Sequence, residues 1–266
     1  ILNETLKTIY SLRTDRVFSD REVSDEDLET ILDACVRAAT GSFRQSYSII
    51  VVRDRKVIKE YLQYEGSKAL IFCVDFNRIL DTAKYLGHTY EVEGIRAFIT
   101  GSTDAILAAQ TAAIAAKSLG IDVFFTNSVT RGPRGWGDMD RIYRKFELPE
   151  KYCFPLIALI LGYSAEKRKY RKGRLKKGVI YYDKYHRLTN EELEEIVKEY
   201  DNPENHLWLD AYEKSRKDFK HYLDWFYTVW SARDKRSLPE KMKLYYQIFK
   251  RTGFLEGMED PQENDR

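Results

Sequence analysis

The 266-residue sequence predicts an α+β domain that carries a helical extension at its C-terminal end. Up to about residue 180, short apolar segments typical of strands alternate with helical patterns. Beyond that point the patterns are helical, and hydrophobic residues make up 43% of the whole chain, enough for a sizeable core. We therefore expect residues 1–180 to form the core and residues 181–266 to form an extension of the same domain.

The first predicted helix begins after Ser24, a good capping residue that is followed by acids in the first turn. Behind it, apolar residues recur at helical spacing, which indicates one buried face. These residues are Leu28, Ile31, Leu32, Cys35, Val36 and Ala39.

Four apolar segments are predicted to be strands. Residues 47–52 form the first and end at a charged run, and residues 69–74 form the second. The second segment is apolar almost throughout, so we expect both faces of its sheet to be covered. Residues 121–125 and 154–161 are the other two.

A long alanine-rich helix is predicted over residues 103–119, with Gly120 as its stop signal. Its small side chains leave little polar surface, so it is central or lies at a subunit interface. After residue 180, tyrosine, tryptophan and charged residues dominate, and helical patterns cover residues 190–200, 207–231 and 238–251.

Composition excludes several classes of protein. The formal net charge is only +2, so the chain as a whole has no strong positive field that would attract nucleic acid. The longest apolar run, 154–161, is too short to cross a bilayer. Three widely spaced cysteines argue against a disulfide scaffold or a zinc ribbon. No signal segment opens the chain, although Ile1 shows that the start is trimmed, so we expect a cytoplasmic protein.

The common nucleotide and metal motifs are missing. No Gly-x-Gly-x-x-Gly follows a strand, no Walker loop is present, and the four histidines share no metal-ligand spacing. The glycines at 132–137 are interrupted by proline and tryptophan, which favours a plain loop over a phosphate cradle. A Ser/His/Asp catalytic triad is not excluded by the sequence, but no nucleophile-elbow motif supports one.

Three segments could bind an anion, and each has a plain structural alternative. Eight of the eleven residues at 167–177 are Lys or Arg, which suits phosphate but on its own favours a solvated linker, with an RNA-binding strip as a third possibility. Arg13 and Arg16 flank a hydroxyl at a helix end. Residues 40–45 offer small polar groups and an amide, or are simply a turn between a helix and a strand.

In chain order, five stretches resemble the nitroreductase superfamily of flavoproteins, and most closely its oxygen-insensitive NADPH nitroreductase and flavin reductase branch. Residues 13–18 (Arg-Thr-Asp-Arg-Val-Phe) are similar to Arg-Ser-x-Arg-x-Phe, and residues 39–50 to a small-polar turn, Phe-x-Gln and strand. Residues 73–78 resemble Cys-Ala-Asp-Phe-Asn-Arg, and residues 104–120 the central dimer-interface helix. Residues 161–165 and 172–175 resemble Leu-Gly-Tyr-Pro-Ala and Lys-Pro-Arg-Leu-Pro.

The resemblance implies a nitroreductase-like fold: a central, mostly antiparallel sheet flanked by helices, in an obligate homodimer whose C-terminal extension wraps the core or the partner subunit. It implies an FMN-binding core, an NADPH or NADH donor, and nitroaromatic, quinone or free flavin acceptors in a ping-pong reaction. The flavin N5 carries the chemistry, so no catalytic side chain and no metal is expected. The implied cofactor-binding residues are Arg13, Thr14, Arg16, Thr40, Gly41, Ser42, Gln45, Thr126, Asn127, Ser128, Lys172 and Arg174.

The chain departs from the pattern of this branch in three places. Asn127 and Ser128 replace a glycine pair, Asp15 replaces an apolar residue, and residues 227–232 lack the arginine that selects the NADPH 2′-phosphate. A flavin-binding or sensing protein without catalysis is therefore the alternative to a reductase, and nucleic-acid binding through residues 167–177 is a distant third hypothesis.

Overall fold

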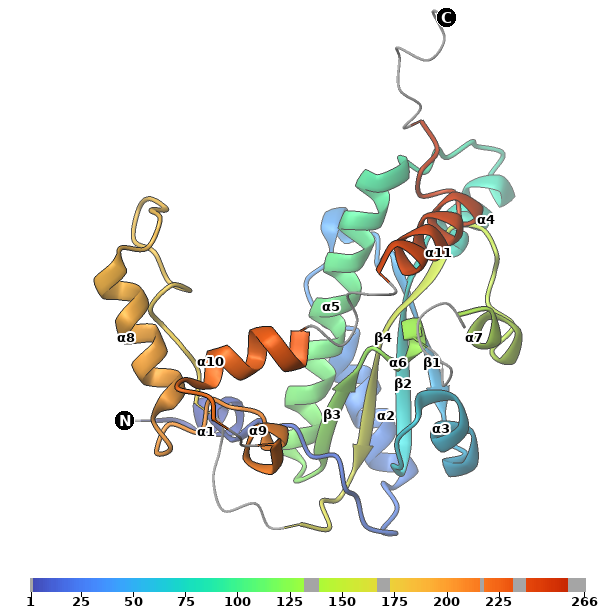
Figure 1. Ribbon diagram of the computed structural model, residues 1–266. Coiled ribbons are helices and arrows are strands. Elements are labelled where there is room, and N and C mark those ends of the chain that lie inside the picture. The colour runs from blue at the N-terminus through green and yellow to red at the C-terminus, as the bar shows by residue number, and fades with distance from the viewer. Residues whose placement is uncertain (1, 132–138, 167–172, 216–217, 232–237, 258–266) are drawn as a thin grey trace, which may run out of the picture. The chain divides into compact units, whose positions relative to one another are not determined.

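The computed structural model describes residues 2–131, 139–166, 173–215, 218–231 and 238–257 (Figure 1). The described residues fall into two compact units, one from Ile1–Glu166 and Lys241–Arg266 and the other from Lys167–Glu240. The glycine-containing segment 132–137 and the basic residues 167–172 lie outside the described ranges.

The first unit is built on a four-stranded antiparallel sheet. Its strands are β1 (Tyr47–Val52), β2 (Lys68–Asp75), β3 (Asp122–Thr126) and β4 (Cys153–Gly162), in the order β1-β2-β4-β3. All four predicted strands are confirmed, and so are the α+β class and the antiparallel sheet. The register puts Tyr47, Val74 and Phe154 side by side at one end, called the Tyr47 end below. Asp122 and Gly162 pair at the opposite end, the Asp122 end.

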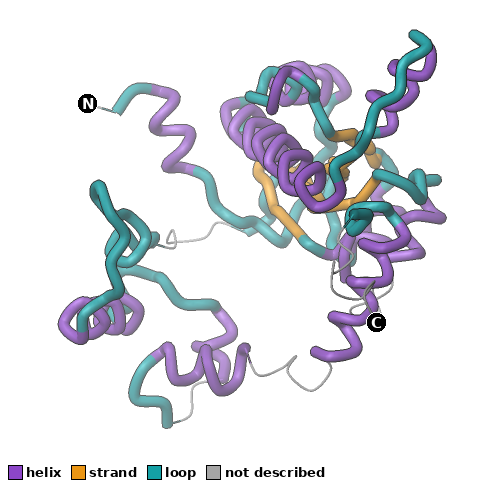
Figure 2. Tube along the Cα trace, turned by 90° about the horizontal axis from the view of Figure 1, so that it is seen from above, coloured by secondary structure: helices purple, strands orange, loops and turns teal. Residues whose placement is uncertain are grey.

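Helices cover both faces of the sheet, as the apolar β2 segment predicts. Leu70 and Phe72 on one face are buried in a cluster with α2 (Asp25–Cys35) and α5 (Gly94–Ser118). Ile71 and Cys73 on the other face are buried with α3 (Arg55–Leu62), α7 (Met139–Lys145) and α11 (Leu238–Arg251). Figures 1 and 2 both show α5 running along the strands. Neighbouring β2 residues are buried in different clusters because successive side chains of a strand point to opposite faces of the sheet.

The two predicted helices of the first unit are present, with one difference in length. The Ser24 hydroxyl accepts a bond from the Asp27 N–H and caps α2, as predicted. Helix α5 begins at Gly94 rather than at residue 103. Its first turns hold two glycines and several β-branched residues, which weaken the sequence signal, and packing compensates for their low propensity. At Gly101 an added Cβ would lie 2.6 Å from the Val74 side chain and 3.1 Å from the Ser46 carbonyl oxygen.

Several short helices have no counterpart in the sequence prediction. They are α3, α4 (Asn77–Tyr85), α6 (Ser128–Arg131) and α7, together with a 3₁₀ turn at Gly41–Phe43, whereas α1 (Glu4–Ser11) is the helix whose end was expected just before Arg13. Asn3 caps α1, Asp54 caps α3, and each helix is about one to three turns long, so the window for a 3.6-residue period is short.

The second unit is helical, and part of its predicted pattern is broken. Helix α8 (Asn190–Asp201) is confirmed and begins with a capping box at Thr189. The predicted helix over 207–231 is instead α9 (Asp210–Ser215), α10 (Tyr222–Trp225) and a π-helical turn, Phe226–Trp230. The break has a physical cause, since Asp201 takes a 2.8 Å bond from the Tyr222 N–H and also pairs with the His221 ring. These tertiary bonds fix a new helix start at residue 221.

In the parts of the chain that the structure describes, no helix combines the length and apolar character that a membrane crossing needs.

Candidate functional site

The segment with the two arginines lies at the Asp122 end of the sheet. The Asp15 N–H donates to the Val123 carbonyl oxygen at 3.2 Å, and the Ser19 N–H donates to the Tyr163 carbonyl oxygen at 2.8 Å. Residue 18 also forms an isolated bridge with Ser164. Residues 13–16, called the phosphate arm below, are thereby fixed beside the first residues of β3.

The phosphate arm presents two cations and a hydroxyl. Arg13 donates from Nε to Asp15 Oδ2 at 3.0 Å, and its side chain is 27% exposed. The Arg16 guanidinium carbon lies 5.1 Å from the centre of the Phe124 ring, a cation–π contact. Thr14 and Arg16 are exposed, and in the described part of the chain Arg16 has no carboxylate within 4.0 Å. This donor set matches what a phosphate group requires.

The end of β3 lies farther along the same strand. Thr126 is three residues beyond Val123, about 10 Å at the usual rise of a strand. Its hydroxyl accepts the Ser128 N–H at 3.1 Å, and Asn127 is exposed. The Ser128 hydroxyl is buried and, within the described ranges, has no hydrogen-bond partner. Other buried groups of the described chain, such as the hydroxyls of Ser46 and Ser102, are orphaned too, so the Ser128 hydroxyl is compatible with a ligand at this turn but does not mark one alone.

A strained loop at residues 40–45 lies at the Tyr47 end. Ser42, Phe43 and Gln45 have φ angles of 53°, 59° and 49°, in the left-handed region that costs side-chain-bearing residues about 1–2 kcal/mol each. Such strain persists only where the surroundings over-determine the backbone, and it concentrates at functional sites.

Two ionic groups, one buried and one exposed, hold the 40–45 loop. The Asp104 carboxylate, 2% exposed on α5, accepts the Thr40 hydroxyl and the Gly41 N–H, both at 2.8 Å. It also accepts the Ser46 N–H at 3.1 Å. From the other side, the Arg78 guanidinium donates to the carbonyl oxygens of residues 44 and 45 at 2.6 and 2.7 Å. The Thr40 hydroxyl also accepts the Gln45 N–H at 2.8 Å, so both of its functions are used inside the loop.

The residues implied for one cofactor site do not all meet within the first unit. The phosphate arm and the β3 end lie along β3, whereas the 40–45 loop lies at the opposite end of the sheet and on its opposite edge. The eight residues of β2 between these ends span about 23 Å. Arg174 belongs to the second unit, where it donates to the Gly173 carbonyl oxygen at 3.0 Å, and Lys172 lies outside the described ranges.

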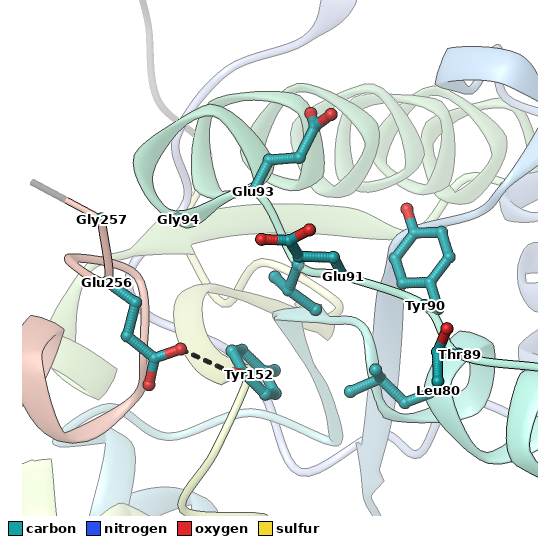
Figure 3. Close-up of a pocket in the computed structure, with 10 residues that line it drawn as sticks. Leu80, Thr89, Tyr90, Glu91, Glu93, Gly94, Tyr152, Glu256 and Gly257 are labelled. Atoms are coloured by element: carbon teal, nitrogen blue, oxygen red, sulfur yellow. Dashed lines mark hydrogen bonds between the residues drawn. The ribbon is translucent and has the colours of Figure 1, made fainter.

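A separate pocket of about 810 Å³ lies where the segment before α5 meets the C-terminal turn (Figure 3). It was not expected from the sequence. The Glu256 carboxylate there accepts bonds from Lys151 Nζ at 2.9 Å and the Tyr152 hydroxyl at 2.8 Å, which hold the pKa of Glu256 below its ordinary value. The Tyr90 hydroxyl on its rim accepts a 3.3 Å bond from Arg44, so the pocket adjoins the 40–45 loop.

No cluster suited to a metal ion, meaning three or more His, Cys, Asp or Glu side chains, occurs in the described ranges.

Comparison with known proteins shows what the chain is similar to. The nitroreductase family model matches residues 9–74, which contain both the phosphate arm and the 40–45 loop. An FMN reductase [NAD(P)H] of Bacillus subtilis is 27% identical over 249 residues, covering 90% of this chain and 94% of that protein. The chain thus resembles the nitroreductase family, whose model it matches over residues 9–74.

Solved structures of nitroreductase-family proteins share the fold. NfrA2 of Bacillus megaterium aligns with a TM-score of 0.70 and 25% identity, covering 90% of this chain and 97% of that one. The NfrA1 nitroreductase of B. subtilis aligns with a TM-score of 0.73 and 23% identity, over 90% and 97% of the two chains. The nitroreductase-like fold implied by the resemblance is thus confirmed.

The sequence did not reveal which residues support the site. Asp104 was visible as an acid within an alanine-rich helical pattern, and a lone buried acid is a signal for a specific partner. Arg78 carried no such signal, because its partners are backbone carbonyl groups 33 and 34 residues away.

Proposed function

We propose that this protein is an FMN-dependent NAD(P)H oxidoreductase that reduces nitroaromatics, quinones or free flavin by a ping-pong reaction. One structural observation carries the proposal: cations lie beside the first residues of β3, and the end of that strand, about 10 Å farther on, leads into Ser128 with its orphaned buried hydroxyl. An anionic group and a flat ring joined by a short chain would fit that spacing. The B. subtilis relative, matched over nearly its whole length, is named FMN reductase [NAD(P)H], which supports the flavin and the electron donor of this proposal.

Different residues of the site bind the phosphate and the ring of FMN. Arg13 and Arg16, joined by Lys172 and Arg174, bind the FMN phosphate through charge-assisted hydrogen bonds of about 1.5–3 kcal/mol each. Thr14 adds a hydroxyl to this set. Thr126, Asn127 and Ser128 border the ring on the β3 side. When bound, FMN supplies hydride transfer at N5, and the protein positions the ring for the donor and the acceptor.

The 40–45 loop completes the site from a second copy of the chain. Gln45, with Thr40, Gly41 and Ser42 around it, lies a full strand length from the phosphate arm of its own chain. The five-carbon chain between the phosphate and the ring of FMN is too short to cover that distance. A homodimer that pairs the phosphate arm of one subunit with the loop of the other removes the conflict.

An exposed apolar stripe on α5 supports this homodimer. Ile95, Ile99 and Ile106 are spaced four and seven residues apart, so they share one side of the helix. Their exposed fractions are 36%, 59% and 52%. Exposed apolar residues gathered in this way mark an interaction surface.

The homodimer is tested by light scattering after size-exclusion chromatography. We expect the double variant Ile99→Glu, Ile106→Glu to run as a monomer and to lose bound FMN, because it places charges in the interface and separates the two halves of each site. Lys56→Glu, on the exposed side of α3, is the control and should stay dimeric with FMN bound. A double variant that remains a dimer would refute the assignment of this interface.

We also propose that the protein is located in the cytoplasm. The cysteines at 35, 73 and 153 are all free and buried, and burial raises the pKa of Cys35 to about 12. Inert structural thiols that form no disulfide are typical of a reducing compartment.

The activity is tested by the absorbance spectrum of the purified protein, recorded anaerobically before and after addition of NADPH and then of NADH. We expect a flavin band that either donor bleaches, with the faster donor defining the preference. A yellow protein that neither donor bleaches would favour the non-catalytic flavin-binding alternative. A colourless protein that does not take up added FMN would overturn the proposal.

A further inference from the structure

Asp15 stands beside a proposed phosphate site, where a negative charge should weaken anion binding. Its side chain is only 1% exposed, so the carboxylate faces protein rather than solvent. A buried carboxylate is costly unless it is paired, and the only cation paired with it among the described residues is Arg13. Asp15 is therefore expected to make a specific contact with Arg13.

The ion pair with Asp15 occupies only the Nε edge of the Arg13 guanidinium and leaves its two Nη groups available. Arg13 Nε donates to Asp15 Oδ2 at 3.0 Å, and within the described ranges neither Nη group has a partner. The Ser164 hydroxyl lies 3.3 Å from Asp15 Oδ1 and 2.8 Å from the Glu166 carbonyl oxygen, so its single hydrogen is shared between the two. Arg13 is therefore the main partner of Asp15.

The backbone around Asp15 makes this contact rigid. The Asp15 N–H is bonded to the Val123 carbonyl oxygen, and the Ser164 N–H donates to Asp122 Oδ2 at 2.9 Å. Asp122 is in turn paired with Lys117 at 2.6 Å. Asp15 and Ser164 are also two positions at which the chain departs from the motifs that it otherwise follows, with an acid for an apolar residue and a serine for a proline. A proline at 164 could not donate the bond to Asp122.

We propose that Asp15 is a positioning residue that holds Arg13 by its Nε edge, so that both Nη groups are ordered for the FMN phosphate before it binds. This inference rests on the proposed function, because it requires the phosphate site. A flexible arginine loses rotamer freedom on binding an anion, and an arginine already held in place loses less. The benefit of order then exceeds the cost of the nearby negative charge.

Asp15→Asn separates the two effects, because they have opposite signs. The variant removes a negative charge, which by itself should tighten FMN binding. It also leaves Arg13 only an uncharged amide oxygen as acceptor, which should loosen Arg13 and weaken FMN binding. We measure the dissociation constants of the apoprotein for FMN and for riboflavin, which lacks the phosphate, by quenching of flavin fluorescence. We expect FMN affinity to fall by about tenfold or more and riboflavin affinity to stay unchanged.

Two further variants complete the test. In an Arg13→Ala background, Asp15→Asn should no longer weaken FMN binding and should tighten it slightly, because only the loss of the negative charge then acts. Asp140→Asn, which breaks an aspartate–arginine pair with Arg251 elsewhere in the same unit, is the matched control and should leave both affinities unchanged. If Asp15→Asn does not fold, Arg13→Lys keeps the charge but removes the Nε edge, and it should also weaken FMN selectively.

The inference is overturned if Asp15→Asn binds FMN as tightly as the wild type or more tightly, or if it weakens FMN and riboflavin equally. An Arg13→Lys variant with wild-type FMN affinity would overturn it as well. A wild-type apoprotein that binds neither flavin is a distinct result, since it overturns the proposed function and this inference together.

Discussion

Asp104→Asn should both destabilise the protein and weaken its binding of the flavin ring. The substitution keeps the shape of the side chain but replaces one carboxylate oxygen with an NH₂ group. If the remaining oxygen keeps the bond from Gly41, the NH₂ group faces the Thr40 hydroxyl and the Ser46 N–H, which donate at 2.8 and 3.1 Å in the wild type. The buried Ser46 N–H would then be left without an acceptor.

The magnitude follows from these contacts. An unsatisfied buried N–H costs about 1–3 kcal/mol, and the loss of the bond from Thr40 adds about 1 kcal/mol. Relaxation of the left-handed residues at 42, 43 and 45 returns part of this energy, so we expect a net loss of about 1–3 kcal/mol in the free energy of unfolding. For a chain of this length, that corresponds to a fall of about 2–6 °C in melting temperature.

The assay is denaturant unfolding combined with flavin titration. Asp81→Asn, an exposed acid on α4, removes the same charge and is the control, with stability within about 0.5 kcal/mol of the wild type. Because the 40–45 loop is assigned to the ring, Asp104→Asn should weaken FMN and riboflavin alike, unlike a change at the phosphate arm. An Asp104→Asn protein as stable as the control would refute the view that this carboxylate holds the loop.

Two other perturbations test the packing of the first unit. Hydrogen bonds from Ser67, then Arg55, then Lys68 lower the pKa of Glu22 from 4.5 to about 2, so its contribution to stability is complete above pH 4.5 and is lost as the pH falls toward 2. Because the Glu22 side chain is half exposed, its contribution to the free energy of unfolding should stay below about 1 kcal/mol. In Glu22→Gln, stability should therefore fall less steeply between pH 4.5 and pH 2 than in the wild type. An equally steep fall in the variant would contradict this role of Glu22. Gly101→Ala should lower the free energy of unfolding by about 1–3 kcal/mol despite its gain in helix propensity, because the new Cβ would lie 2.6 Å from the Val74 side chain. Thr103→Ala, at an exposed position of the same helix, should be neutral or slightly stabilising, and equal effects of the two substitutions would argue against close packing at residue 101.

The sequence predicted the sheet well because its strands are long, apolar and bounded by charged or glycine residues. The buried segment 69–74 could be interpreted without tertiary information, since an apolar run of that length needs cover on both faces. The short helices α3, α4 and α7 were not predicted, because one to three turns give too few residues for a period to stand out. The pattern over 207–231 predicted one helix, and bonds from Asp201 to the backbone and ring at 221–222 divide it.

The sequence by itself determined the α+β class, the order of the strands along the chain and the motifs of the family, since these depend on local periodicity and on residue identity. Only the tertiary structure decided how the site residues relate in space. It placed the phosphate arm and the 40–45 loop at opposite ends of one sheet, and it turned Asp15 from an unexplained acid into the partner of Arg13. The physical reason is that hydrogen bonds and ion pairs form between neighbours in space, and Asp104 and Thr40 become neighbours only when α5 packs against the sheet.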